Sequence, residues 1–138
     1  MTATILYEGN LRCNALHLQS GTSIETDAPT DNKGKGEHFS PTDLVCTALA
    51  TCIITTMAIK TDTMGIELKG TSINVKKHMI TDPIRMIGAI DVEINFPNSL
   101  VLEEKDKSIL RRVGDNCPVT KSLHPDVKLN IVYNFSNG

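Results

Sequence analysis

The sequence predicts an α+β fold with the element order βββ-α-ββ-α-α-β. Short strand patterns separated by turn residues fill the first 26 positions, a long apolar helix pattern follows, and alternating strand patterns resume after position 70. Strands and helices occur in runs rather than in regular alternation, which favours α+β over a doubly wound parallel sheet. With 138 residues, the chain has the length of a single domain, so we expect one domain spanning residues 1–138.

The N-terminal region is predicted to form an antiparallel meander of three short strands, at residues 3 to 8, 11 to 18 and 22 to 26. Gly9-Asn10 and Ser20-Gly21 supply the turns between these strands. Residues 27 to 37 then carry Gly, Pro, Asp and Asn at a density typical of a loop. A loop of this length inside a compact domain is usually functional or disordered.

A long helix is predicted from Pro41 to about Met64. Ser40 suits the N-cap, Pro41 suits the first helical position, and Gly65 suits the stop. At 100° per residue one narrow stripe consists of Leu44, Ala48, Cys52, Thr55 and Ile59. Much of the opposite side consists of Val45, Cys46, Leu49, Ile53 and Met57. A helix that is apolar on both sides belongs in a core or in a dimer interface.

The C-terminal half is predicted to contain strands at residues 70 to 80 and 87 to 96, joined through Asp82-Pro83. Pro97-Asn98-Ser99 is expected to cap a helix over residues 100 to 114. A short helix beginning at Cys117 and a last strand over residues 127 to 135 complete the order.

Composition argues against several classes of partner. The net charge is −2, the basic residues are scattered, and there are only three Phe and two Tyr, so nucleic-acid binding is not expected. The N-terminus lacks the pattern of a signal peptide. Threonines interrupt the most apolar window, about residues 44 to 59, so no membrane span is expected. We expect a cytoplasmic protein, in which four cysteines would rest reduced.

Two cysteines are candidates for redox chemistry. Pro118 fits the first position of a short helix, which makes Cys117 its N-cap, and helix N-termini lower the pKa of cysteine thiols. The alternative is that Cys117 only fills a helix cap near the core. Cys52 lies in the middle of the long helix, where a small core residue is the default interpretation. To be reactive, Cys52 would need hydrogen-bond donors or a cation from elsewhere, such as Arg12.

Other chemistries find less support in the sequence. Cys46 and Cys13 are interpreted as packing residues. Four histidines and four cysteines could supply metal ligands, but they show neither Cys-x-x-Cys nor His-x-x-x-His spacing. A Gly-x-Ser-x-Gly motif and a complete glycine-rich phosphate loop are also missing. No metal or cofactor is therefore expected.

The stretches Ser40-Pro41-Thr42-Asp43-Leu44-Val45, Ala48-Leu49-Ala50-Thr51-Cys52 and Cys117-Pro118-Val119-Thr120-Lys121-Ser122-Leu123 resemble the OsmC/Ohr family of peroxide-handling redox proteins. The element order resembles that family as well, so the resemblance covers nearly the whole chain. It implies an intertwined homodimer with two buried central helices packed against antiparallel sheets, and active sites at the subunit interface. In that family the helix cysteine, here Cys52, reduces a hydroperoxide, and the Cys-Pro-Val cysteine, here Cys117, resolves the product.

One departure from the family concerns the carboxylate that holds an arginine against the reactive thiol. The peroxide-specific branches carry a glutamate directly after the proline of the helix start, and this chain has Thr42 there. Arg12 is the candidate arginine, and Asp43 or Glu37 is the candidate carboxylate. In this respect the chain resembles the loosely characterised OsmC-like members more than either well-studied branch of the family.

The sequence therefore predicts a thiol-dependent peroxidase that reduces a hydroperoxide with Cys52 and Cys117 and is recycled by an external dithiol reductant. Two alternatives remain at this point. One is a non-enzymatic binding or structural dimer, and the other is a general thiol–disulfide redox protein without peroxide specificity. The long apolar helix independently favours a C2 dimer, because one sheet can cover only one side of it. Alternatively, the second helix and the meander cover that side within one chain.

Overall fold

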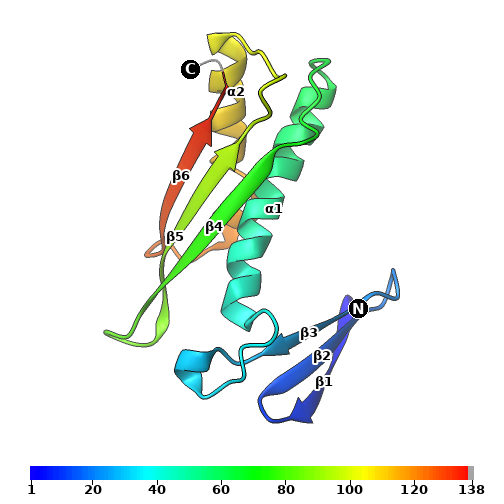
Figure 1. The fold of residues 1–138 in the computed structure, drawn as a ribbon, viewed down its shortest axis with the longest axis vertical. Coiled ribbons are helices and arrows are strands. Elements are labelled where there is room, and N and C mark those ends of the chain that lie inside the picture. Colours follow the sequence, from blue (N-terminus) through cyan, green and yellow to red (C-terminus); the bar gives the residue numbers. More distant parts are fainter. Residues whose placement is uncertain (137–138) are drawn as a thin grey trace. The chain divides into compact units, whose positions relative to one another are not determined.

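The computed structural model describes residues 1–136 and has the predicted element order (Figure 1). The chain divides into two compact units, Met1–Val45 and the part from Cys46 onward. Each unit has a three-stranded sheet of its own. The α+β class and the order βββ-α-ββ-α-α-β are confirmed.

The first unit contains the expected antiparallel meander. Its strands pair in the order β1-β2-β3, with bounds β1 (Ala3–Gly9), β2 (Arg12–His17) and β3 (Ser23–Asp27). Asn10 and Leu11 have positive φ values of 55° and 62°, which is typical of a tight hairpin turn. The register of β2 on β3 sets Arg12 opposite Asp27. The loop that follows contains a short 3₁₀ turn, η1 (Thr30–Asn32).

Helix α1 (Pro41–Asp62) begins where the sequence predicts and ends two residues earlier. The backbone N–H of Asp43 donates to Ser40 Oγ (3.0 Å), and the backbone N–H of Ser40 donates to Asp43 Oδ2 (2.9 Å). This reciprocal pair is a capping box. At the other end Gly65 has a φ of +69°, and the Ile66 N–H donates to the Thr61 carbonyl, which closes the helix.

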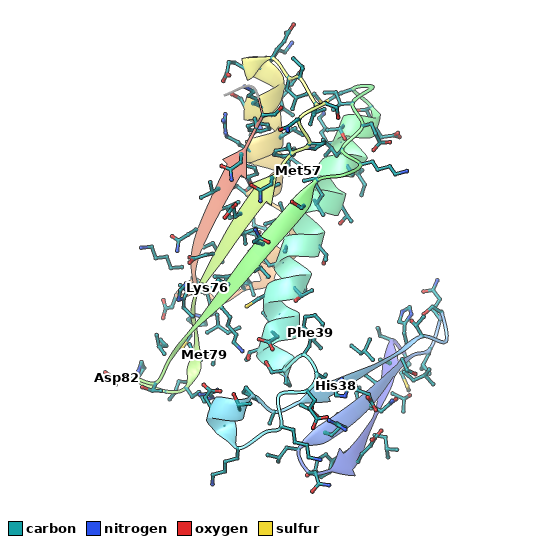
Figure 2. All side chains as sticks on the ribbon, in the orientation of Figure 1. His38, Phe39, Met57, Lys76, Met79 and Asp82 are labelled. Carbon is teal, nitrogen blue, oxygen red and sulfur yellow. The ribbon has the colours of Figure 1, made fainter. Side chains whose placement is uncertain are left out.

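The two sides of α1 differ in burial as the sequence predicts. In the second unit the buried side consists of Cys46, Leu49, Ala50, Ile53, Met57 and Thr61. Met57 is labelled on this helix in Figure 2. The other side leaves Ala48, Thr51, Thr55, Ala58 and Ile59 exposed. By length and composition alone α1 would qualify as a membrane span, contrary to our prediction, although core helices of soluble proteins pass the same test.

The sheet of the second unit is mixed. Its strands pair in the order β4-β5-β6, with bounds β4 (Ser72–Ile80), β5 (Met86–Asn95) and β6 (Lys128–Asn134). β4 and β5 are antiparallel, but β6 runs parallel to β5. The prediction of antiparallel sheets is therefore wrong for this pair, because the chain crosses over through α2 (Glu104–Gly114) and α3 (Pro118–Ser122) before β6 begins.

The core of the second unit lies on one face of this sheet. Ile90, Val92 and Ile94 of β5 form one buried cluster with Leu49, Ile53 and Met57 of α1 and with Leu110 of α2. Helix α2 begins at Glu104, four residues later than predicted, with Glu103 as its N-cap. The prediction that Pro97-Asn98-Ser99 caps this helix is wrong, because the preceding segment packs buried Leu102 into the core before the helix starts.

Candidate active site

Cys117 is the N-cap of α3, as predicted. Its backbone is extended (φ −67°, ψ 159°), Pro118 occupies the first turn, and its Sγ accepts a hydrogen bond from the backbone N–H of Thr120 at 3.4 Å. The Thr120 hydroxyl lies 3.1 Å from the same sulfur. The Cys117 residue is fully buried, with 0% of its surface exposed. The cap therefore holds a buried sulfur among hydrogen-bond donors.

The fold brings Cys52 to Cys117. Cys52 is half-buried on α1, and the side chain of Cys117 is one of the hydrogen-bond partners that lower the pKa of its thiol. Its sulfur also accepts from the backbone N–H of Val119, the second residue of α3. A third partner is the Thr56 hydroxyl, one turn further along α1, at 3.8 Å. The first turn of α3 thus donates N–H groups to both sulfurs, from Val119 to Cys52 and from Thr120 to Cys117.

These contacts shift the protonation equilibrium of Cys52. Burial raises the pKa of the Cys52 thiol, but the hydrogen bonds from Val119, Thr56 and Cys117 together outweigh burial and leave the pKa below its ordinary value. Donors from outside α1, which the sequence analysis considered necessary for a reactive Cys52, are thus present, although the donors in the second unit are not cationic. Sequence analysis missed Val119 and Thr56. The i,i+4 spacing of Cys52 and Thr56 on one helix could have indicated the latter.

In the first unit Arg12 is held mainly by Asp27, which the sequence analysis did not single out. Arg12 Nε and Nη2 donate to the two carboxylate oxygens of Asp27 at 2.7 and 2.9 Å, a bidentate pair. The Asp27 side chain is 1% exposed. Its pKa falls to about 2, because the hydrogen bonds from Arg12 and from the Glu37 backbone N–H outweigh burial. The same hydrogen bonds from Arg12 to Asp27 raise the pKa of Arg12 further.

The two carboxylates proposed from sequence have different positions. Glu37 Oε2 lies 3.5 Å from Arg12 Nη2, with the Glu37 side chain 60% exposed, so the predicted pairing with Arg12 is present but peripheral. Asp43 forms the capping box with Ser40 at the start of α1. Thr42, which stands at the position of the family glutamate, has its hydroxyl 3.2 Å from Ser40 Oγ. Asp27 stands opposite Arg12 in the pairing of β2 with β3, so the correct strand register would have indicated it.

The arrangement in the second unit supports thiol chemistry. Two neighbouring thiols, one of them with a lowered pKa, are the components of dithiol–disulfide exchange. No disulfide joins the cysteines in residues 1–136, all four of which are described. Within that same range no cluster of three or more His, Cys, Asp or Glu side chains has the geometry to hold a metal ion.

Comparison with known proteins identifies the family. The family model described as OsmC-like protein matches residues 34–132. A Psychrobacter arcticus structure, provisionally assigned as an osmotic stress induced and detoxification response protein, is 42% identical, with a TM-score of 0.91 over 97% of this chain and 96% of its own. No curated protein sequence matches the chain.

More distant structures share the fold. The organic hydroperoxide resistance protein OsmC of Legionella pneumophila is 13% identical, with a TM-score of 0.75 over 98% of each chain. The organic hydroperoxide resistance protein OhrB of Bacillus subtilis is 15% identical, with a TM-score of 0.67 over 97% of this chain and 98% of its own. At such identities the likeness extends to the fold alone. The family match and the 42% identical relative show that the chain belongs to the OsmC-like protein family.

Proposed function

We propose that the protein is a thiol-dependent peroxidase in which Cys52 attacks a hydroperoxide and Cys117 resolves the product. The observation that carries the proposal is the hydrogen-bonded thiol pair, with the Val119 N–H donating to the Cys52 sulfur. These donors stabilise the thiolate, which is the nucleophilic form of cysteine. Cys117, a hydrogen-bond partner of Cys52, is the thiol that would condense with an oxidised Cys52.

In the proposed reaction the sulfur atoms of Cys52 and Cys117 carry the oxidation. The Cys52 thiolate attacks the distal peroxide oxygen, the O–O bond breaks, and the alkoxide leaves as an alcohol after taking a proton, while Cys52 becomes a sulfenic acid. The Cys117 thiolate then attacks the sulfenic sulfur, a disulfide forms, and hydroxide leaves as water after protonation. An external dithiol reduces this disulfide by exchange and is itself oxidised to a disulfide. A cytoplasmic location belongs to the proposal, because both thiols must start reduced.

Arg12 is the proposed activating cation, an assignment that rests on the family resemblance. Its support in this chain is the bidentate pair with Asp27, together with Glu37 at 3.5 Å, because these contacts fix the guanidinium in one orientation. Asp27 therefore takes the part that the resemblance gave to the family glutamate. Asp43, whose role here is to cap α1, would influence the reaction only through the helix start.

A homodimer is the second component of the proposal. The exposed side of α1 carries Ala48, Thr51, Thr55, Ala58 and Ile59, and Ile59 is 74% exposed. These residues are small or apolar and would let a second copy of the helix approach closely. A self-complementary contact of this kind would cover the side in a single C2 interface.

Steady-state turnover tests the proposal. Consumption of tert-butyl hydroperoxide is followed with dithiothreitol as reductant in the wild type, Cys52→Ser, Cys117→Ser and Cys13→Ser. The proposal expects activity in the wild type and in Cys13→Ser, and none above background in Cys52→Ser. Undiminished turnover in Cys52→Ser would contradict it. Turnover of a disulfide substrate without turnover of any hydroperoxide would instead support a general thiol–disulfide redox protein. The observation that favours this alternative is Thr42 at the position of the family glutamate.

A further inference from the structure

The turn that joins α2 to α3 is tied to the sheet by one tyrosine. Tyr133, on β6, donates its hydroxyl proton to Asp115 Oδ1 at 2.7 Å, and its hydroxyl oxygen lies 3.3 Å from the carbonyl oxygen of Arg111. Asp115 is the C-cap of α2, and Cys117 follows two residues later as the N-cap of α3. The phenol is therefore bonded to the segment that carries Cys117 into the site.

Close packing at Gly114 brings this hydroxyl within reach of the turn. A Cβ atom at Gly114 would lie 2.4 Å from Tyr133 Oη, closer than non-bonded atoms approach, so a larger residue would displace the phenol or the end of α2. Gly114 is buried and has an ordinary helical position. The glycine is required here for space, and the space it leaves is filled by the tyrosine.

The Tyr133 side chain is held by aromatic stacking and its backbone by strand pairing. Its ring lies parallel to that of Phe135 at 6.5 Å between centroids, and Phe135 stacks on Phe96 at 4.5 Å. On the strand, Tyr133 pairs with Ile94 of the central strand β5, whose side chain is fully buried. Burial and the hydrogen bond to Asp115, together with the neighbouring charge of Asp115, raise the pKa of Tyr133. The phenol therefore stays protonated and remains a donor at neutral pH.

We infer that the hydrogen bond from Tyr133 to Asp115 fixes the position of Cys117, which makes Tyr133 and Asp115 positioning residues for the resolving step. This inference rests on the proposed function. Resolution requires the Cys117 sulfur to reach the sulfenic sulfur of Cys52 in line with the departing oxygen, and small displacements of a reacting group are costly in rate. The attack of Cys52 on the peroxide does not involve Cys117 as a nucleophile and should depend much less on this anchor.

The test separates the two chemical steps. Reduced protein is mixed with one equivalent of tert-butyl hydroperoxide, and the Cys52 sulfenic acid is trapped with dimedone at successive times and measured by mass spectrometry. In Tyr133→Phe, which keeps the ring and removes the hydroxyl, we expect peroxide consumption at the wild-type rate. Resolution should slow by about tenfold, so that dimedone-labelled Cys52 accumulates. This factor corresponds to the loss of one hydrogen bond near the upper end of the usual net contribution of such bonds.

Three further variants distinguish positioning from general loss of structure. Asp115→Ala should reproduce the accumulation, whereas Asp115→Asn, which keeps an acceptor oxygen, should resolve nearly as fast as the wild type. Combining Tyr133→Phe with Asp115→Ala should add little to either change, because both remove the same bond. Tyr7→Phe removes the hydroxyl of the other tyrosine in the sequence and should behave as the wild type.

The possible results distinguish a failure of the proposed function from a failure of the positioning inference. If the wild type forms neither a sulfenic acid nor a Cys52–Cys117 disulfide, the proposed function fails. If the wild type forms both and Tyr133→Phe resolves at the wild-type rate, the positioning inference is overturned while the proposed function stands. Should Tyr133→Phe not fold, Asp115→Ala decides the question on its own, and wild-type resolution in that variant would overturn the inference.

Discussion

The backbone N–H of Val119 donates a hydrogen bond to the thiol of Cys52, although 66 sequence positions separate the two residues. The next N–H along the chain, that of Thr120, donates to Cys117. One turn of a five-residue helix thus places donors on both thiols of the proposed reaction. The pair is close because α3 lies within the crossover between β5 and β6, whose register fixes where that crossover returns to the sheet.

The lowered pKa of Cys52 predicts a difference between two threonine variants. Thr56→Val removes a hydroxyl 3.8 Å from the Cys52 sulfur, so the thiolate loses a donor and the pKa of Cys52 should rise. Alkylation of the Cys52 peptide by iodoacetamide at pH 7, followed by mass spectrometry, should slow about threefold, as expected for a weak hydrogen bond. Thr55→Val is the matched control, because the Thr55 hydroxyl donates to the Thr51 carbonyl. Equal alkylation rates in the two variants would contradict the assignment of Thr56 as a donor.

Asp27 predicts how stability depends on pH. The pKa of Asp27 in the folded protein is about 2, below the ordinary value of 3.8, so its ionised form is favoured by folding. The stability it contributes is present at neutral pH and is lost as the pH falls from about 4 to about 2. At neutral pH Asp27→Asn should melt at a lower temperature than the wild type. As the pH falls through this range, its melting temperature should decrease less than that of the wild type. Asp62→Asn, at an exposed carboxylate, is the control, and its melting temperature should depend on pH as that of the wild type does. The same pH dependence in Asp27→Asn would refute the prediction.

The exposed side of α1 predicts the effect of a charge in the proposed dimer interface. Ala48→Arg would bury a guanidinium between two helices, so the protein should sediment at the mass of one chain, 15.1 kDa, while the wild type sediments at twice that mass. Ser108→Arg, at an exposed position of α2, should sediment as the wild type does. In the proposed dimer folding and association would be coupled, so the melting temperature of the wild type should rise with protein concentration. Sedimentation of the wild type as a monomer at micromolar concentration would contradict the dimer.

Local signals predicted much of this fold. The Ser40 cap, the two sides of α1, and Cys117 followed by Pro118 are each specified within a few residues, and each is present in the structure. The start of α2 and the direction of β6 were predicted wrongly, because both depend on tertiary context: the burial of Leu102 and the crossover through α2 and α3.

The residues of the site likewise divide into those that local sequence predicts and those that depend on the tertiary structure. Pairing of Arg12 with Glu37 could be proposed from sequence, but the main partner, Asp27, follows only from strand register. The Val119 donor needs the complete topology of the second unit, since neither residue type nor spacing connects it with Cys52. The anchor formed by Tyr133 and Asp115 is non-local for the same reason.

The central claim is that Cys52 and Cys117 form a disulfide in response to a hydroperoxide, and a thiol count tests it most directly. Reduced protein is treated with one equivalent of tert-butyl hydroperoxide, remaining thiols are titrated, and the digest is searched for a peptide joining Cys52 to Cys117. The account predicts the loss of two of the four thiols per chain and the presence of that cross-linked peptide, with Cys13 and Cys46 left reduced. Four intact thiols after treatment would contradict it and would favour a binding or structural protein.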